Sequence, residues 1–421
     1  MTSLHIETVE RIDDIDATDW NALVKCSGGS VLLQHGFLRA FEQSASVCAD
    51  TGWQPRHMLL RAGRSATGES GAATGKAEAA VGKAEAAAGN AGATTGQAGP
   101  DPGQLIAAIP LYAKSHSYGE FVFDWAWAEA YSRNGLAYYP KWLCAVPFTP
   151  VPGARLLAAP DCRALAARAL VQFAGASKLS SLHVLYTTDP DQQALLDAGC
   201  MPRTHVQFHW VNRGWRHFDE FLADLTQSKR KKIRAERRKV REAGVTTLVR
   251  TGTEIRAEDW AFFYRCYANT YQQRGNPPYL TPAFFEAVGE QFPDHCVMAL
   301  ALLHGQPIAA PLLWRDTVDG VPRLYGRYWG ALRHVDCLHF ELAYYTPLEW
   351  AIGNGIAVVE GGAQGEHKLA RGFEPVQTQS AHWLAHPAFA DAVSRYLDRE
   401  REGVEGYAQG LGSPFRPEVG D

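Results

Sequence analysis

The order of predicted elements repeats along this chain of 421 residues. In the second half, two helical patterns precede a strand meander with tight turns, a helix and further strands. These segments are helices 258–273, 282–291 and 338–353 and strands 295–303, 308–315, 323–330, 356–360 and 377–385. The first half shows strands or extended runs 56–61, 105–112, 145–158, 181–186 and 205–210 and helices 162–174 and 191–198. The amino acids themselves do not repeat, so the sequence predicts two mixed α/β domains of similar architecture, with a ligand cleft between or beside them.

The domain boundaries follow from changes in composition and pattern. We expect a first domain over residues 1–205, a second over 206–402 and a C-terminal tail over 403–421. An insert in the first domain, residues 63–103, consists mainly of Gly, Ala, Ser and Thr. Such a segment buries too little side chain to offset the entropy lost on ordering, so we predict that it is disordered. Because strand-like runs flank it, we interpret it as the expanded loop of a hairpin.

Composition limits the class of protein. Hydrophobic residues make up 46% and aromatic residues 11% of the chain, which is typical of a globular protein with large cores. The eight cysteines never form a Cys-x-x-Cys pair, which argues against a zinc site or disulfide framework and favours a cytoplasmic location. Residues 1–20 are acidic and lack an apolar core, so no signal peptide is expected. No apolar run approaches the ~18 residues of a membrane span, so any membrane contact would be peripheral.

A strongly basic segment lies within an otherwise acidic chain. Ser228–Arg241 holds nine basic residues and one acidic residue, whereas the whole chain has a formal charge of -4. Ile233 and Val240 could form a thin apolar seam, and Gly244 follows the charges, so we predict a helix over 228–243. Its charge suits a polyanion such as a nucleotide diphosphate, for example that of a nucleotide-sugar, a coenzyme phosphate, an RNA backbone such as that of tRNA, or a phospholipid surface. A solvated helix face without a ligand is the alternative. The phosphate-binding candidates are Lys229, Arg230, Lys232, Arg234 and Arg237.

Residues 115–131 combine aromatic rings with polar groups. Ordinary packing would account for the aromatic rings, but the polar tips among them also suit the orientation of a ligand. The substrate-binding candidates in this segment are Tyr118, Asp124, Trp125 and Tyr131.

A second candidate region joins a strand to the start of a helix. The free backbone N–H groups of a helix N-terminus can stabilise an anion or a developing oxyanion. His339 and Glu341 could serve as base or base-orienting groups, although Glu341 could also simply complement the helix dipole. Pro347 predicts a kink in this helix, because its ring displaces the carbonyl of Ala343. The strand supplies Tyr325 and Tyr328 as catalytic candidates and Arg327 and Trp329 as binding candidates.

A glycine-rich loop, residues 360–373, follows the strand 356–360. Polar loops at the carboxyl end of a strand often carry function in α/β proteins, and a solvated turn is the alternative. The loop supplies Glu366 and His367 as catalytic candidates and Gln364, Lys368 and Arg371 as binding candidates. No metal site is indicated, because His205 and His209 are expected on a strand and no His-Glu-x-x-His motif is present.

Five stretches together resemble one known family. They are Ser117–Trp127, Val146–Val151, Lys229–Arg241, Tyr325–Gly330 and Gly365–Gly372. They are similar to the FemAB-like peptidoglycan biosynthesis/recognition proteins of the GNAT acyltransferase superfamily, over nearly the whole chain apart from the insert and the tail. The resemblance implies two tandem GNAT-like acyl-CoA N-acyltransferase domains. It also implies transfer of an acyl or aminoacyl group to an amine, with acyl-CoA or aminoacyl-tRNA as the donor.

One departure from the superfamily pattern concerns the donor. GNAT enzymes that use acyl-CoA usually carry Arg/Gln-x-x-Gly-x-Gly/Ala before the central helix, whereas residues 331–340 contain no glycine here. Side chains in this loop hinder the close backbone approach that a pyrophosphate needs. Coenzyme A is therefore disfavoured as the donor in the second domain.

We expect an N-acyltransferase without a metal, acting on a small-molecule or peptide amine such as a peptidoglycan precursor. Glu341 or His367 would accept the amine proton, and positioning and oxyanion stabilisation would supply most of the rate. Tyr325 or Tyr328 would protonate the leaving group. One alternative is a catalytically inactive module that binds a cell-wall fragment or nucleic acid. Another is non-specific RNA binding through the basic helix alone.

Overall fold

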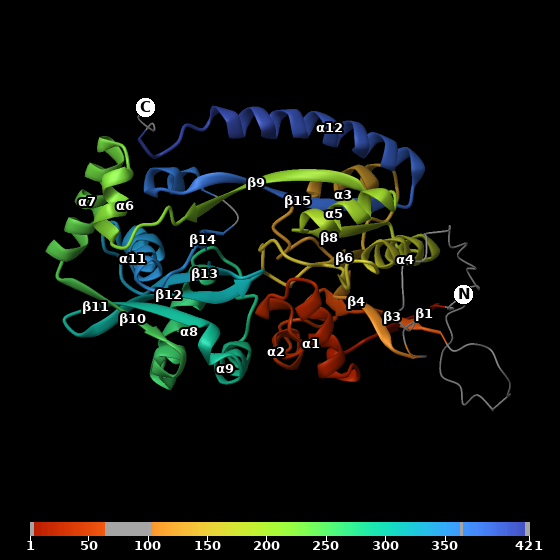
Figure 1. Cartoon of the computed structure of the whole chain (residues 1–421), viewed down its shortest axis with the longest axis horizontal. Helices are drawn as coiled ribbons and strands as arrows, with labels where there is room; N and C mark the ends of the chain where they lie inside the picture. The colour runs from red at the N-terminus through yellow and green to blue at the C-terminus, as the bar shows by residue number, and fades with distance from the viewer. Residues whose placement is uncertain (1–3, 64–100, 102, 363–364, 417–421) are drawn as a thin grey trace, which may run out of the picture.

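The computed structural model describes residues 4–63, 101, 103–362 and 365–416 (Figure 1). The N-terminal half contains β1 (Leu4–Val9), α1 (Ala17–Cys26), α2 (His35–Gln43), β2 (Trp53–Pro55), β3 (His57–Ala62), β4 (Leu105–Ile109), β5 (Leu111–Lys114), α3 (Trp125–Arg133), β6 (Lys141–Cys144), β7 (Leu157–Ala158), α4 (Arg163–Ala176), β8 (Ser181–Leu185) and α5 (Asp189–Asp197). The C-terminal half contains β9 (Met201–Val211), α6 (Phe218–Asp224), α7 (Gln227–Glu242), β10 (Val245–Thr251), α8 (Ala257–Gln272), α9 (Pro282–Gln291), β11 (Cys296–Leu303), β12 (Gln306–Val318), β13 (Val321–Ala331), α10 (Leu338–Phe340), α11 (Thr346–Gly353), β14 (Val358–Glu360), β15 (Glu374–Leu384) and α12 (Pro387–Gly410). Short turns are η1 (Ile12–Asp14), η2 (Val31–Leu33), η3 (Gly252–Glu254), η4 (Pro293–His295), the π-helical η5 (Glu341–Tyr345) and η6 (Glu366–Arg371).

Two β-sheets form the frame of the molecule. The smaller sheet has the strand order β1-β3-β4-β7, and the larger has the order β10-β11-β12-β13-β14-β9-β15-β8-β6-β5-β2. The mixed α/β class predicted from the sequence is therefore confirmed. β3 and β4, which flank the insert 63–103, pair antiparallel as expected for a hairpin. The predicted disorder of the insert concerns residues that lie mostly outside the described part of the chain.

The predicted helix 338–353 with a kink at Pro347 is wrong in detail. The structure divides it into α10, a π-helical turn at Glu341–Tyr345 and α11. Pro347 has no backbone N–H, so the carbonyl of Ala343 cannot receive the usual bond from the residue four positions later. The helix widens into a π-helical turn just before the proline. The disruption at Pro347 is therefore a π-helical turn and not the simple kink that we predicted.

The two halves share strands across their boundary. β9 pairs with β15 over Met201–His209 and with β14 over His209–Val211. β15, the last strand of the chain, also pairs antiparallel with β8 of the N-terminal half. The larger sheet is therefore continuous through both halves, and the domain boundary expected after residue 205 falls within β9.

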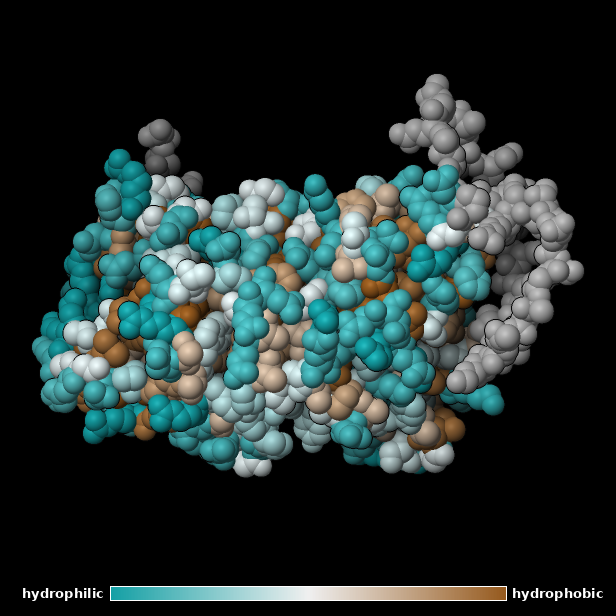
Figure 2. Space-filling model, turned by 90° about the horizontal axis from the view of Figure 1, so that it is seen from below, coloured by the Kyte–Doolittle hydropathy of each residue, from teal (hydrophilic) through white to brown (hydrophobic). Residues whose placement is uncertain are grey.

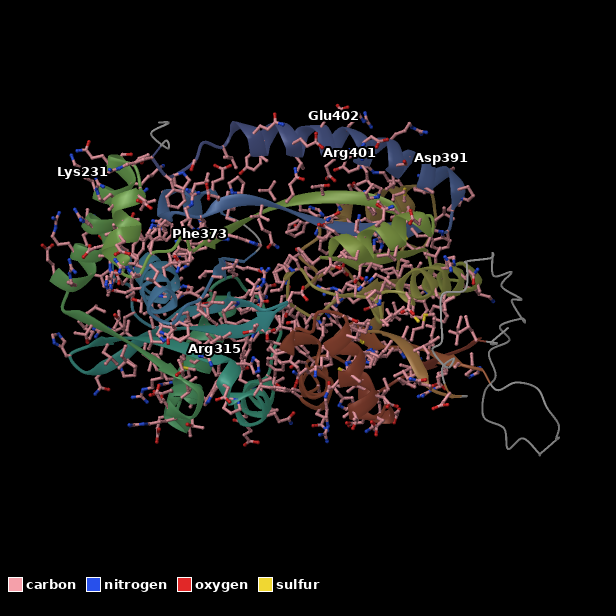
Figure 3. The ribbon with its side chains drawn as sticks, viewed as in Figure 1. Lys231, Arg315, Phe373, Asp391, Arg401 and Glu402 are labelled. Carbon is pink, nitrogen blue, oxygen red and sulfur yellow. The ribbon has the colours of Figure 1, made fainter. Side chains whose placement is uncertain are left out.

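The long helix α12 lies across the outer side of the strands β9 and β15 (Figure 1). Arg203 on β9 makes a two-pronged ion pair with Glu400 on α12, at 2.7 and 2.9 Å. Glu402 lies on the outer side of the same helix (Figure 3). The tail expected from residue 403 begins inside α12, because the helix continues to Gly410.

Charged and polar residues make up most of the surface seen from below. Seen from below, most residues are hydrophilic, with hydrophobic residues scattered among them (Figure 2). Among the helices that the structure describes, none is both long enough and apolar enough to cross a bilayer.

The predicted basic helix is confirmed as α7. Its apolar seam, Ile233 and Val240, is buried, and Gly244 follows the helix with φ of 78°. That positive φ is the left-handed conformation that glycine adopts without strain at a helix end. Lys231 projects from the outer end of α7, away from the centre of the molecule (Figure 3). The helix therefore offers its charges at one end of the molecule.

β13 packs directly on α8 at Gly330. A Cβ at this position would lie 1.9 Å from the carbonyl oxygen of Cys266, and backbone cannot move aside as a flexible side chain can. We expect Gly330→Ala to lower the free energy of unfolding by about 1–3 kcal/mol or more, as overpacking does. Denaturant unfolding measures this change. Gly353→Ala is the matched control, because nothing lies within 4 Å of its Cβ. Equal stability of the two variants would contradict the close contact.

Candidate functional site

A cavity of about 430 Å³ lies between residues of both halves. The N-terminal half supplies Ser117, Tyr118, Gly119, Phe121, Phe123, Trp125 and Phe148. The C-terminal half supplies Tyr267, Tyr271, Tyr279, Gly326, Arg327, Tyr328, Gly361 and Gly362. Most of the lining side chains are aromatic, and Arg327 is the one charged residue among them. The described lining thus combines aromatic rings and polar groups with one positive charge.

The cavity opens where two parallel strands part. β13 and β14 pair in parallel up to Tyr325 and Glu360, and β14 then ends while β13 continues to Ala331. Just beyond the last pair, β13 lines the cavity with Gly326 and the loop after β14 lines it with Gly361. Small residues on both sides leave room for a ligand against the backbone.

The corresponding place in the first half is filled by the protein itself. β6 and β8 are also parallel neighbours, and their pairing ends at Cys144 and Val184. Just beyond it, Arg155 Nε donates a hydrogen bond to the Leu185 carbonyl at 2.7 Å. The same guanidinium donates to two further backbone carbonyls, and the side chain is only 1% exposed. Arg155 therefore occupies the space that in the second half is open.

Glu360 ends β14, directly before the lining residue Gly361. Its Oε1 is 3.2 Å from Arg323 Nη1, whereas its buried Oε2 has no hydrogen-bond partner within the described part of the chain and lies 3.9 Å from His209 Nε2. Burial raises the pKa of Glu360 to about 7, and the positive charges of Arg323 and Arg327 partly oppose this rise. A carboxyl group with a pKa near neutrality can accept and release a proton at physiological pH.

Two further polar groups belong to the cavity or to its surroundings. The hydroxyl of the lining residue Tyr328 is buried and has no hydrogen-bond partner among the residues that the structure describes, and burial raises its pKa to about 12. It is therefore protonated at neutral pH and free to donate. Lys368 Nζ donates to the carbonyl of Gly362 at 2.9 Å, and burial lowers its pKa to about 7. Of the three groups, Tyr328 lines the cavity itself, Glu360 directly precedes the lining residue Gly361, and Lys368 bonds to the lining residue Gly362.

The 117–125 segment, which forms the wall supplied by the first half, rests on a buried charge cluster. Lys141 Nζ donates to Ser117 Oγ and to Glu120 Oε2, both at 2.8 Å, and also pairs closely with Asp124. All three charged side chains are almost fully buried. Burial raises the pKa of Glu120 to about 7, and the Lys141 charge opposes this rise. These buried contacts hold the 117–125 segment in place.

Four of the residues singled out in the sequence line this cavity: Tyr118, Trp125, Arg327 and Tyr328. Asp124 lies behind the cavity wall in the Lys141 cluster, and Tyr325 is buried in the core. Tyr131 packs against other aromatic rings. Glu366 is exposed and accepts a hydrogen bond from α12 at 2.7 Å. Gln364 lies outside the described residues.

Other candidates form a second group beside the cavity, around η6. The rings of Trp329 and His339 are 5.0 Å apart, and the Tyr344 hydroxyl lies 2.9 Å from His367 Nε2. Burial lowers the pKa of His339 to about 4. Burial and the nearby Arg371 charge lower the pKa of His367. Both imidazoles are therefore neutral at physiological pH.

The basic helix α7 contacts this second group. Arg371 pairs with the buried Glu236 of α7 at 2.9 Å, and Arg237 of α7 pairs with Glu341 at 3.0 Å. Glu341 is thus held in an ion pair rather than placed at the cavity. The candidate cations split by exposure: Lys232 and Arg234 are exposed, whereas Lys229, Arg230 and Arg237 are half-buried. No α7 residue is among the described residues that line the cavity.

Sequence reasoning missed several residues of the cavity: Phe148, Tyr267, Tyr271, Tyr279 and the underlying Lys141 and Glu120. Tyr267 and Tyr271 are four residues apart and so share one face of α8. That spacing is equally typical of a packed core, so it carries no functional signal alone. Within the described ranges, no group of three or more His, Cys, Asp or Glu side chains is placed to hold a metal ion.

Comparisons with known proteins give likenesses of fold. A tandem GNAT protein from the clavulanic acid biosynthesis pathway is 12% identical, with a TM-score of 0.43 over 91% of this chain and 99% of that one. The C-terminal domain of a putative lysylphosphatidylglycerol synthetase from Agrobacterium fabrum is 10% identical, with a TM-score of 0.43 over 62% and 82%. A GCN5-related N-acetyltransferase from Kribbella flavida is 18% identical, with a TM-score of 0.28 over 67% and 90%.

The sequence itself identifies a family. No curated protein matches the chain. The model of the FemAB-like family, described as peptidoglycan biosynthesis/recognition, matches residues 11–74 and 83–417. Because this match spans most of the chain, the protein belongs to the FemAB-like family.

Proposed function

We propose that the protein transfers an acyl or aminoacyl group to an amine, and that transfer takes place in the cavity beside β13 and β14. The observation that carries this proposal is the cavity at the point where the parallel strands β13 and β14 separate, close to Glu360 and Tyr328. A proton acceptor and a proton donor near one cavity are what acyl transfer to an amine requires. Membership of the FemAB-like family supports the same reaction class.

The proposed step balances with the donor's own leaving group. The amine nitrogen attacks the carbonyl carbon of a thioester or ester, so that a C–N bond forms and the C–S or C–O bond breaks. Glu360 accepts the amine proton, directly or through one water. Tyr328 gives its proton to the departing sulfur or oxygen. Holding both substrates together in the cavity supplies the rest of the rate.

We assign the reaction to the second half of the chain. In the first half, the buried guanidinium of Arg155 lies where the equivalent strands separate and donates to three backbone carbonyls. The first half instead supplies the wall formed by the 117–125 segment and Phe148. This division explains why one cavity uses residues of both halves.

The basic helix α7 is our candidate for binding the phosphates of the donor or of a nucleotide-linked acceptor. η6 connects it to the cavity: Lys368 bonds to the cavity residue Gly362, and Arg371 pairs with Glu236 of α7. A long polyanion such as the acceptor stem of a tRNA could follow this path. The absence of glycine in residues 331–340 favours aminoacyl-tRNA over coenzyme A.

Turnover with defined donors tests the proposal. Protein is incubated with acyl-CoA or aminoacyl-tRNA and a mixture of amines, and new amides are detected by mass spectrometry. We expect Tyr328→Phe to lower kcat by at least about tenfold, because the leaving group loses its proton donor. Tyr264→Phe is the control, since Tyr264 is not among the cavity residues. Ligand binding without any amide product would favour the binding-module alternative.

A further inference from the structure

Arg327 is held in place but keeps unused hydrogen-bond donors. One end of its guanidinium, Nη2, donates to the Phe148 carbonyl. The guanidinium carbon also lies 5.6 Å from the ring centre of Phe121 and 5.4 Å from that of Tyr328. Its Nε is buried and has no hydrogen-bond partner among the described residues. A buried donor without a partner is unfavourable, so this arrangement suits an acceptor brought by a ligand.

The surroundings of Arg327 limit the charge of that ligand. Arg327 is the one charged side chain among the described lining residues, and aromatic rings form most of the wall. A diphosphate or nucleic-acid backbone would bring several negative charges and call for several cations. A carboxylate brings one charge and two oxygens, which match the planar donors of a guanidinium. The cavity therefore suits a monoanion with an apolar body.

The opposite charge of the ligand would find its own partners. Tyr118, Tyr271 and Tyr279 line the cavity, and aromatic faces attract an ammonium group. Glu360, directly before the lining residue Gly361, adds a buried carboxyl group whose Oε2 has no hydrogen-bond partner in the ranges that the structure describes, and the charge of Arg327 acts on it. A carboxylate at Arg327 and an amine toward Glu360 would thus both be matched. The volume of about 430 Å³ lies within the range of small-molecule sites.

We infer that the acceptor is an amino acid or short peptide with an apolar side chain, whose carboxylate binds Arg327 while its amine faces Glu360. This inference rests on the proposed function and names the substrate class of the same cavity. The aromatic wall selects the apolar side chain. Arg327 orients the molecule so that the amine, and not the carboxylate, meets the acyl carbonyl.

Binding measured without turnover tests the inference. The probes are phenylalanine, phenylalaninol, which lacks the carboxylate, and glycine, which lacks the side chain. Isothermal titration should show phenylalanine binding at least about tenfold tighter than either of the others, the effect of one lost charged hydrogen bond or one lost apolar group. Equal affinity for phenylalanine and phenylalaninol, or no binding of phenylalanine, would overturn the inference.

Variants of the protein separate Arg327 from general effects. Arg327→Gln should abolish the preference for phenylalanine over phenylalaninol, and Arg327→Lys should keep part of it, because a lysine retains the charge but not the fork. Arg274→Gln is the matched control, since Arg274 is exposed and is not among the lining residues. An unchanged preference in Arg327→Gln would overturn the inference. If Arg327→Gln does not fold, the inference is tested by the binding of the three probes to the unaltered protein and to Arg327→Lys.

The two proposals fail in different ways. Selective binding of phenylalanine without amide formation from any donor would refute the proposed transfer and keep the ligand class. Amide formation on amines without a carboxylate, at the same KM as on amino acids, would keep the transfer and refute the role of Arg327. In the supporting case, Arg327→Gln raises KM for phenylalanine by at least about tenfold and changes kcat much less.

Discussion

Replacing Glu360 by glutamine should lower kcat by about 10²- to 10⁴-fold, the usual contribution of a general base. Glutamine keeps the size of the side chain and its contact with Arg323 but cannot accept the amine proton. The unaltered protein should gain activity as the pH rises through about 7, because the pKa of Glu360 is raised to about 7 and only the deprotonated form is active. Profiles of kcat/KM against pH measure both effects.

The control for this variant is Glu349→Gln, which changes an exposed carboxylate that pairs with Arg237. A rate in Glu360→Gln within a few-fold of the unaltered protein would remove Glu360 from the mechanism.

The dependence of stability on pH gives an independent test of the raised pKa of Glu360. A carboxyl group with a raised pKa stabilises the fold below its ordinary pKa of 4.5 and loses this contribution as the pH rises through about 7. Glu360→Gln should not show this loss of stability, because glutamine does not titrate.

Replacing Lys141 by methionine should lower the free energy of unfolding by about 3–5 kcal/mol, the usual effect of breaking a buried ion pair. The Lys141 side chain is 0% exposed, and its partners Glu120 and Asp124 are 1% and 2% exposed. Removal of the ammonium would leave two carboxyl groups in a dry site, where a charge without a partner is strongly unfavourable. Chemical denaturation measures the loss.

Two comparisons make this result specific to the cluster. Lys178→Met, at an exposed position, should change stability little. Adding Glu120→Gln and Asp124→Asn to Lys141→Met should restore part of the stability, because neutral amides need no counter-charge. Lys141→Met as stable as Lys178→Met would show that the cluster does not hold the 117–125 segment as described.

Local patterns predicted the elements that depend on local sequence. The basic helix was recognised from its charge run and apolar seam, and α9 was predicted with its observed bounds Pro282–Gln291. The strand meander of β11, β12 and β13 followed from apolar runs separated by glycine turns. Long-range pairing was not predictable: β15 joins β8, a contact between residues almost 200 positions apart, and no periodicity encodes such a partner.

The candidate site was predicted only in part, because it too depends on contacts between segments that are distant in the sequence. Tyr118, Trp125, Arg327 and Tyr328 were singled out and do line one cavity. Their catalytic and binding roles stay predictions. His367 and Glu341 were equally plausible as bases, but tertiary packing places Glu341 in an ion pair with Arg237. Glu360 drew attention only as the start of a glycine loop, because its raised pKa depends on burial by distant segments.

The shared strands have a consequence for how the chain is made. While the ribosome synthesises the protein, β8 emerges long before β15, its partner on one side. Until residue 384 has left the exit tunnel, that edge of β8 lacks its final neighbour, and open strand edges are where chains adhere to one another. A nascent N-terminal fragment should therefore depend on chaperones, and a premature stop within β15 should yield insoluble product rather than a smaller, working protein.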